Sequence, residues 1–457
     1  MRHLVTIIGG GLAGCEAAMM LSRFGINVRL FEMKPKKYSP AHKLATLGEL
    51  VCSNSLGSTL PNSAPGLLKA EMQDLHSVVL EAGYESMVPA GNALGVDRDR
   101  FSKFIQQKVE MNPLVEIRHE ECQSLPKDSH VIVATGPLTS DALAGDLTQK
   151  IGEDTLYFYD SISPIVSAES IDFSKTFFAN RYAEDSEDYL NCPMDQTLYE
   201  TFVKEIISSE KVPVKSFEAL KCFEACLPIE VLAERGMRTL SFGPMKPVGL
   251  TNPHDDRPPY AVVQMRREND PTTLYNLVGF QTRMKWGDQK RIFRMIPGLQ
   301  NAEFVRFGSM HRNTYIESPK ILDAHLTLKN DSKIAFAGQI TGVEGYVESA
   351  AMGQWAALSM ASKILLGQPC PLPPSDSAMG GLIRSITQKP LHGLFSPTNI
   401  NFGLLPPIIS QKKIKKEDRR RQMVERARTS FSAWIAGLDE SLRKTFENKT
   451  IKRSHVG

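Results

Sequence analysis

Residues 4–32 read LVTIIGGGLAGCEAAMMLSRFGINVRLFE, and their pattern is the strongest indication of the fold. The apolar run at 4–8 is typical of a buried parallel strand, and residues 15–24 have the composition of a helix that ends before Gly25. A second strand is expected at 27–31, directly before Glu32. The order strand, helix, strand predicts a βαβ unit, and with it an α/β fold built on a parallel sheet.

The turn between this strand and helix has the spacing G-x-G-x-x-G, at Gly9, Gly11 and Gly14. A tight turn needs small residues, and the helix behind it offers N–H groups and a positive dipole end to a pyrophosphate. We therefore expect a dinucleotide to bind at Gly9, Gly10, Gly11, Leu12, Ala13 and Gly14, with Glu32 accepting hydrogen bonds from a ribose. Glycines that only pack the helix on the sheet are one alternative. A loop for S-adenosylmethionine is another, although it usually has G-x-G-x-G.

Two later segments favour FAD over NAD as the dinucleotide. Residues 130–137 (HVIVATGP) predict a strand that enters an ATG turn, and residues 333–346 (KIAFAGQITGVEGY) predict a strand followed by a glycine-rich turn and a helix. Large flavoproteins often return such a late strand to the flavin, an analogy at the level of the fold. The sequence predicts a discontinuous, Rossmann-like FAD-binding domain of the glutathione-reductase type with an inserted α+β domain.

We place the domain boundaries from these motifs. The first part of the FAD-binding domain is expected at 1–160, an inserted substrate or RNA domain at 161–324, and the second FAD-binding part with basic C-terminal helices at 325–440. Residues 441–457 are expected to form a flexible tail. A chain of 457 residues is long enough for such an arrangement.

Composition excludes several classes of protein. Hydrophobic residues make up 42% of the chain and the net charge is only +3, which excludes a mainly disordered protein. The most apolar long stretch, 347–366, contains Glu348 and Lys363, and no signal peptide is evident, so we expect a cytoplasmic protein without a membrane span. Seven cysteines without a CxxC pair, and no HExxH motif, predict no metal site.

A basic stretch lies near the C-terminus. Residues 411–428 contain four Lys, five Arg and three acidic residues. Such a stretch is either a solvated, amphipathic surface helix or a patch for a polyanion such as RNA. Composition alone slightly favours the surface helix.

At 49–56 the sequence reads ELVCSNSL, with GGGLAG (9–14) before it and GLLKAEM (66–72) after it. Further motifs are FEACLPIEVLAERG (223–236), FGPMKPVGL (242–250), NLVGFQTRMKWGDQKRIFRMIPGLQNAEFVRFGSMHRNTYI (276–316), AGQITGVEGYVESAAMG (337–353) and NINFGLLPPI (399–408). Over nearly its whole length the chain resembles the folate- and FAD-dependent tRNA (uracil-5-)-methyltransferases, the TrmFO family, relatives of the MnmG-type tRNA-modifying flavoproteins. Gly57 departs from the resemblance, because a basic residue is expected after CSNSL.

The resemblance implies C5 methylation of the T-loop uridine of tRNA. Methylenetetrahydrofolate would donate the carbon, reduced FAD would act as carrier and reductant, and NADH or NADPH would recharge the FAD. With tRNA as substrate, the basic stretch is favoured as part of the RNA footprint. The same chemistry on ribosomal RNA, a small-molecule FAD oxidoreductase, and an RNA-binding flavoprotein without activity are the alternatives.

Uracil C5 is a poor nucleophile, and a thiolate added to C6 makes C5 reactive, after which the C5 proton must leave. Cys52 and Cys226 are the two cysteines inside family motifs. We expect them to meet across the flavin, with Cys226 attacking C6 and Cys52 removing the proton or protecting the loaded carrier. Cys222 with Cys226 could instead be a redox pair or half a metal site. The other cysteines are expected to be buried small residues: Cys15, Cys122, Cys192 and Cys370.

A second group of basic residues lies in the block QTRMKWGDQKR, which contains Arg283, Lys285, Trp286 and Lys290. It is either an exposed helix start or a contact with the folate tail or tRNA phosphates, with Trp286 available for stacking.

Overall fold

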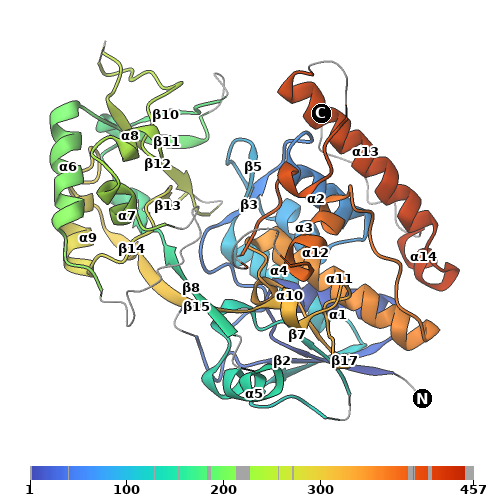
Figure 1. Ribbon diagram of the computed structural model, residues 1–457. Helices are drawn as coiled ribbons and strands as arrows, with labels where there is room; N and C mark the ends of the chain where they lie inside the picture. Colours follow the sequence, from blue (N-terminus) through green and yellow to red (C-terminus); the bar gives the residue numbers. More distant parts are fainter. Residues whose placement is uncertain are drawn as a thin grey trace.

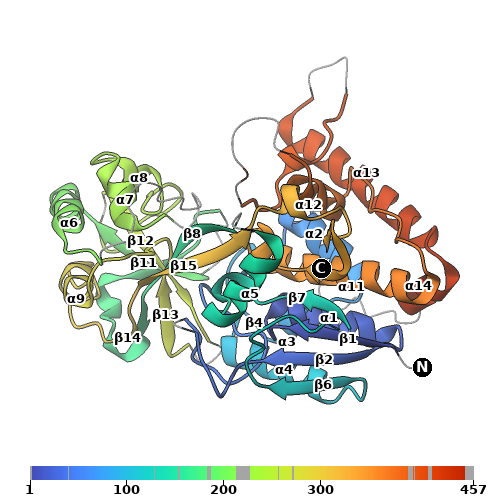
Figure 2. The ribbon, with the colours of Figure 1, turned by 60° about the horizontal axis from the view of Figure 1, so that its bottom comes forward.

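The computed structural model describes residues 3–447, except 40, 128, 153–154, 183–186, 213–226, 256, 270–271, 390–394, 396 and 410–413 (Figure 1). The chain forms two lobes, one built from its first and last thirds and one from its middle (Figures 1 and 2). Each lobe has its own hydrophobic core.

The first lobe is built on a six-stranded sheet. Its order is β16 (Thr327–Leu328), β17 (Asp331–Phe336), β7 (His130–Val133), β1 (Leu4–Ile8), β2 (Asn27–Glu32) and β6 (Val115–His119). All neighbours are parallel except β16 and β17. All residues but the first of β1 and of β7, and the last three residues of β17, are buried, because a parallel sheet is covered on both faces.

The register aligns the carboxyl ends of four strands. Ile8 of β1 lies opposite Phe31 of β2 and Val133 of β7, and Val133 lies opposite Phe336 of β17. The turns that follow these strands therefore meet at one edge of the sheet. The GGGLAG, ATG and GQITG turns follow β1, β7 and β17, and Glu32 ends β2 at the same edge. Ligands bind at this edge in open α/β sheets.

Helices surround this sheet. Helices α1 (Leu12–Arg23) and α11 (Tyr346–Leu366) pack against each other so closely that a Cβ on Gly353 would lie 2.3 Å from the Ala13 carbonyl oxygen. The other α-helices of this lobe are α2 (Ala64–Asp74), α3 (Val78–Glu85), α4 (Arg98–Glu110), α5 (Asp141–Ile151), α10 (Ser318–Ile321), α12 (Ala378–Thr387), α13 (Lys416–Ala436) and α14 (Glu440–Glu447). A small antiparallel sheet joins β3 (Ser55–Ser58), β5 (Ala93–Val96) and β4 (Met87–Val88).

The second lobe has a six-stranded antiparallel sheet. Its order is β10 (Phe177–Ala179), β11 (Tyr189–Met194), β12 (Ala261–Arg267), β13 (Leu274–Leu277), β9 (Ile165–Ser167) and β14 (Phe304–Arg306). The same lobe contains α6 (Gln196–Ser208), α7 (Ile229–Glu234), α8 (Thr239–Phe242) and α9 (Trp286–Phe293). The strands β8 (Thr155–Ile162) and β15 (Ser309–Ile316) pair antiparallel, so the chain enters and leaves this lobe through one two-stranded ladder (Figure 2).

The fold class predicted from the sequence is confirmed, because separated segments build one parallel sheet and the middle forms a lobe of its own. The expected tail at 441–457 is wrong for its first residues. Helix α14 buries Leu442, and Phe446 is 8% exposed with its ring 5.9 Å from that of Phe24. Residues 448–457 lie outside the described part of the chain. None of the described helices is both long enough and apolar enough to cross a membrane.

Candidate functional site

The GGGLAG turn forms a cradle in front of α1. Gly11 is the N-cap residue, and a Cβ on it would meet no described heavy atom within 4 Å, so the space before the first turn is open. A Cβ on Gly14 would lie 1.9 Å from the Gly9 carbonyl oxygen, so this glycine lets the helix pack on the turn. The first N–H groups of a helix have no partner within it, and they are suited to a phosphate. The cradle therefore fits the pyrophosphate of a dinucleotide.

Glu32 lies beside this cradle, at the end of β2. Its carboxylate accepts hydrogen bonds from the backbone N–H of Gly10 at 3.0 Å and of Lys34 at 2.9 Å. The buried Lys34 ammonium in turn pairs with Glu49 at 3.2 Å and donates to the Thr46 carbonyl at 2.7 Å. Glu49 is the first residue of ELVCSNSL, so the end of β2 is tied directly to the segment that carries Cys52.

The cysteine loop, defined here as residues 50–54, contacts the start of α11. The backbone N–H groups of Cys52 and Ser53 donate to the Tyr346 hydroxyl at 2.6 and 3.2 Å. Tyr346 is the first residue of α11, which follows the GQITG turn after β17. Burial raises the pKa of Tyr346, so its phenol is neutral. The loop is therefore held near the sheet edge that carries the dinucleotide cradle.

Arginine side chains hold the carbonyl groups of the same loop. Arg98 donates to the carbonyls of Leu50 at 2.6 Å and Cys52 at 3.2 Å, and Arg306 donates to the carbonyl of Val51 at 2.9 Å. Arg98 also pairs with Glu268 at 2.8 Å. Arg98 starts α4 in the first lobe, whereas Arg306 and Glu268 belong to the second lobe, so both lobes build this site.

Asn54 closes the loop against the second lobe. Its side-chain oxygen accepts from Arg266 at 2.9 Å, and its side-chain nitrogen donates to the carbonyls of Val96 at 3.0 Å and Arg267 at 2.9 Å. Asn54 is fully buried. This position in CSNS is therefore a structural link between the lobes.

The structure describes only part of the predicted pair of catalytic cysteines. Cys52 lies on the described loop, but Cys226 and its neighbour Cys222 lie outside the described residues. Cys15, Cys192 and Cys370 are buried as expected, and burial raises the pKa of Cys370 to about 12. Cys122 is only half-buried, so its expected burial is wrong. In the described part of the chain, no group of three or more His, Cys, Asp or Glu residues could hold a metal ion.

The block around Trp286 divides into inward and outward residues. Arg283 is buried and pairs with Glu230 at 3.6 Å, so it stabilises the second lobe. Lys285 is exposed and pairs with Glu210 at 2.6 Å. Trp286 is 67% exposed, and its ring stacks on Phe307 at 5.6 Å. Only this outward part can contact a ligand.

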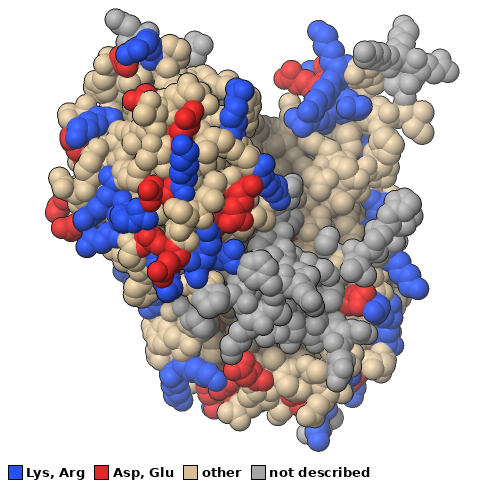
Figure 3. Space-filling model, turned by 60° about the vertical axis from the view of Figure 1, so that its left-hand side comes forward, with Lys and Arg blue, Asp and Glu red and all other residues tan. Residues whose placement is uncertain are grey.

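The described part of the basic stretch lies on α13. Four residues of this helix are buried, Met423, Ala427, Phe431 and Trp434, and their spacing places them on one face of the helix. Arg428 pairs with Asp74 at 2.7 Å and Arg421 with Asp418 at 2.9 Å. Figure 3 shows a hollow between the lobes, with Lys and Arg gathered at the top of the right-hand lobe, where Figure 1 places the start of α13. Lys412 and Lys413 lie outside the described residues.

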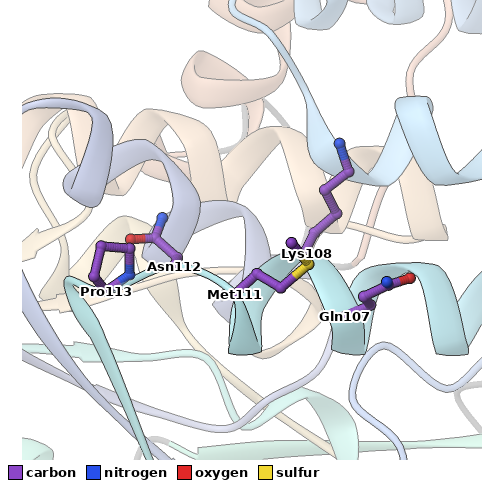
Figure 4. A pocket seen from close by; sticks show the side chains of 5 residues that line it. All are labelled: Gln107, Lys108, Met111, Asn112 and Pro113. Carbon is purple, nitrogen blue, oxygen red and sulfur yellow. The ribbon is translucent and has the colours of Figure 1, made fainter.

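A surface hollow of about 440 Å³ lies at the end of α4 (Figure 4). Its lining residues are Gln107, Lys108, Met111, Asn112 and Pro113. They include none of the residues of the cradle or of the cysteine loop.

Five residues of the site were missed by sequence reasoning: Arg98, Arg266, Glu268, Arg306 and Tyr346. Tyr346 and Arg306 lie inside motifs quoted for the resemblance, which is a usable signal. Arg98 and Glu268 lie outside those motifs, and only the tertiary structure brings them together.

Comparisons with known proteins agree with this geometry. The family model described as Glucose inhibited division protein A matches residues 4–367. A methylenetetrahydrofolate–tRNA-(uracil-5-)-methyltransferase TrmFO of Geobacter sulfurreducens is 52% identical over 437 residues, which cover 95% of this chain and all of that protein. The protein of the same name from Aquifex aeolicus is 50% identical over 95% of this chain and 97% of its own length.

The chain belongs to the TrmFO family. Among solved structures, Aquifex aeolicus GidA in its form I crystal matches with a TM-score of 0.68, covering 98% of this chain and 78% of that one at 17% identity. Its form II crystal gives a TM-score of 0.67 and covers 75% of that chain. At this identity the likeness shows the fold, so this chain shares the architecture of GidA.

Proposed function

We propose that this protein is a methylenetetrahydrofolate-dependent tRNA (uracil-5-)-methyltransferase that uses FAD. The observation that carries the proposal is the position of Cys52, whose loop is held between the two lobes and contacts Tyr346 near the edge that carries the dinucleotide cradle. The names of the TrmFO relatives supply the substrate and the carbon donor. A cysteine beside a dinucleotide site suits a reaction that needs both a thiolate and a redox cofactor.

The residues of the cradle fit FAD. The backbone N–H groups of Gly11 to Gly14 would hold its pyrophosphate, and Glu32 would accept from its ribose. When bound, FAD carries the one-carbon unit and supplies the electrons that reduce it to a methyl group. NADH or NADPH is the electron source in this proposal, and the reaction takes place in the cytoplasm.

The protein supplies the thiol chemistry. In our proposal the Cys226 thiolate forms a bond to C6 of the uracil, the π electron pair of the C5–C6 double bond moves onto C5, and C5 then attacks the one-carbon unit. Cys52 accepts the proton that C5 loses, or shields the carbon unit before transfer. The C6–S bond then breaks and returns the Cys226 thiolate. Cys52 suits a proton-handling role because its loop is held rigidly from both lobes.

The outward face of α13 is our candidate for part of the RNA contact. Arg421 and Arg428 pair with carboxylates, whereas Lys415, Lys416, Arg419 and Arg420 lie in the first turns of the helix or just before it. Figure 3 places Lys and Arg beside the hollow between the lobes, and a duplex backbone there would meet positive charge.

The test is a methylation assay with defined variants. Unmodified tRNA, methylenetetrahydrofolate and NADH or NADPH are incubated with the purified protein, and the nucleosides are analysed for 5-methyluridine. Cys52→Ala and Cys226→Ala should each lose methyl transfer and keep bound flavin, whereas Cys122→Ala, on the same lobe as Cys52, should keep both. A tRNA with 5-fluorouridine should trap the nucleophile in wild type and in Cys52→Ala, but not in Cys226→Ala. Full methylation by both Cys52→Ala and Cys226→Ala would contradict the thiolate mechanism. Methylation of ribosomal RNA but not of tRNA would show that ribosomal RNA is the substrate.

A further inference from the structure

Three successive carbonyl groups of the cysteine loop are bound by guanidinium groups. Arg98 donates hydrogen bonds to the carbonyls of Leu50 and Cys52, and Arg306 donates one to the carbonyl of Val51. Surface loops normally leave such carbonyls to water. Here two charged side chains from different lobes hold the backbone on both sides of the Cys52 side chain, so the position of the thiol depends on them.

The same side chains concentrate positive charge around Cys52. Arg98, Arg266 and Arg306 all interact electrostatically with Cys52, and the carboxylate of Glu268, which pairs with Arg98, opposes their charge. The Glu268 side chain is 2% exposed and that of Arg98 14%, so water screens these charges weakly. The cluster therefore keeps excess positive charge beside a thiol.

The interactions are mutual. Burial favours loss of the Arg98 proton, but the carboxylate of Glu268 outweighs it and raises the pKa of Arg98, and a thiolate at Cys52 would act in the same direction. Burial lowers the pKa of Arg306 and of Arg266, and in both cases a thiolate at Cys52 would oppose the loss of the proton. A thiolate at Cys52 is thus a favourable neighbour for all three arginines.

We propose that Arg98 and Arg306 are positioning residues for Cys52, which hold its loop in place and, together with Arg266, stabilise its thiolate. The inference rests on the proposed function for the role of Cys52 in methyl transfer. Because Arg306 and Glu268 come from the second lobe, the reactivity of a thiol on the first lobe depends on the docking of the second lobe.

Other titratable groups near the cluster could also affect the titration of Cys52. Tyr346 faces Cys52 from α11 and is neutral. Lys43 faces Arg306 and Arg98 from the segment before the loop, and burial together with these charges lowers its pKa. Glu49 opposes that effect on Lys43. The variants below leave Tyr346, Lys43 and Glu49 in place, so a change in the reactivity of Cys52 reports the arginines and Glu268.

The experiment measures the alkylation of Cys52 by iodoacetamide as a function of pH in the purified flavin-bound protein. Trypsin releases residues 44–69, in which Cys52 is the single cysteine, so mass spectrometry reports its modification alone. Removing the charge in Arg306→Gln should raise the midpoint of the pH profile by about one unit. Arg306→Lys keeps a charge and should stay near the wild-type midpoint. Glu268→Gln should move the midpoint in the opposite direction, to lower pH.

Three controls keep the result interpretable. Arg294→Gln removes a guanidinium that binds the Ala302 carbonyl at 2.9 Å in the same lobe, and it should leave the midpoint of Cys52 unchanged. Cys122, in the peptide 119–127, should keep its profile in every variant. Modification of the buried Cys15 and Cys192 in Arg306→Gln would show that this variant is unfolded. The shift of the Cys52 midpoint in Glu268→Gln would then be the test of the proposal.

Unchanged Cys52 midpoints in Arg306→Gln and Glu268→Gln would overturn the proposal and leave the arginines a purely structural role. Equal shifts in Arg306→Gln and Arg306→Lys would also overturn the charge argument. The assay needs no tRNA, so its failure is separate from that of the proposed function. If Cys52→Ala still methylated tRNA, the methyltransferase role of Cys52 would fail even with the shifts observed.

Discussion

Gly11 and Gly14 lie three residues apart in one motif, yet the structure predicts opposite consequences for replacing them with alanine. A methyl group on Gly14 would lie 1.9 Å from the Gly9 carbonyl oxygen, so α1 and the turn must separate by more than about 1 Å to reach ordinary contact. Overpacking of this kind typically costs about 1–3 kcal/mol. We expect Gly14→Ala to lower the Tm of the flavin-free protein and to weaken FAD binding as a consequence.

A methyl group on Gly11 meets no described heavy atom within 4 Å, and the residue has an extended conformation with φ −75° that alanine tolerates. Alanine is a poorer N-cap residue than glycine by about 0.5–1 kcal/mol, and its smaller unfolded-state entropy offsets about 0.4–1 kcal/mol. The Tm of the flavin-free protein should therefore stay close to that of wild type.

The same methyl group fills the space that the pyrophosphate needs. Loss of one hydrogen bond to a charged phosphate costs about 1.5–3 kcal/mol, which corresponds to roughly 10- to 100-fold in Kd. Flavin is removed from wild type and both variants, FAD is titrated back, and flavin fluorescence gives the Kd while calorimetry gives the Tm. Wild-type FAD affinity in Gly11→Ala would refute the assigned cradle. An unchanged Tm in Gly14→Ala would refute the packing argument.

Three further predictions concern RNA binding, pH dependence and the C-terminal helix. The cations at the start of α13 are Lys415, Lys416, Arg419 and Arg420. Replacing them with glutamine should weaken tRNA binding and make the logarithm of the binding constant less dependent on the logarithm of the salt concentration, by about 0.9 in slope for each phosphate that is no longer neutralised. Lys150→Gln on α5 should leave this slope unchanged. The Glu71 carboxylate accepts from the N–H groups of Ala378 and Met379 at 2.8 Å, and burial raises its pKa from 4.5 to about 8. Since the folded state holds this proton more tightly than the unfolded state, the contribution to stability is full below about pH 4.5 and is lost as pH rises through about 8. Between pH 5 and 8 the Tm should fall more steeply in wild type than in Glu71→Gln, and parallel slopes would exclude Glu71 as the cause. Phe446→Ala should destabilise the first lobe by about 2–4 kcal/mol, because its ring packs on Phe24 in the core; calorimetry showing no loss of stability would return α14 to the expected tail.

The strength of local patterns explains which parts of the fold were predictable. The βαβ unit is observed as β1, α1 and β2 with ends within a few residues of those expected, because apolar periodicity and the glycine turn act over short distances. The late strand at 331–336 was found for the same reason. Helix α14 was missed because its apolar residues are few, and only the pocket formed by Phe24 and its neighbours gives Phe446 a place to pack.

The candidate site divides in the same way. Gly11, Gly14, Glu32 and Cys52 could be named from the sequence, since each lies in a continuous motif whose chemistry is local. The partners of Cys52 could not. Arg98 and Glu268 are 170 positions apart, and their ion pair forms only because the second lobe docks on the start of α4.

The βαβ unit with its glycine turn, the split of the first lobe around an inserted one, and the family of the chain could all be predicted from the sequence. These follow from residues that are neighbours in the chain, where spacing alone dictates backbone geometry. The contacts that hold the cysteine loop, in contrast, become visible only in the folded chain. Its carbonyls are bound by Arg98 and Arg306, its amides donate to Tyr346, and Glu268 pairs with Arg98. Hydrogen bonds and Coulomb interactions act through space, so no local pattern in the chain records them.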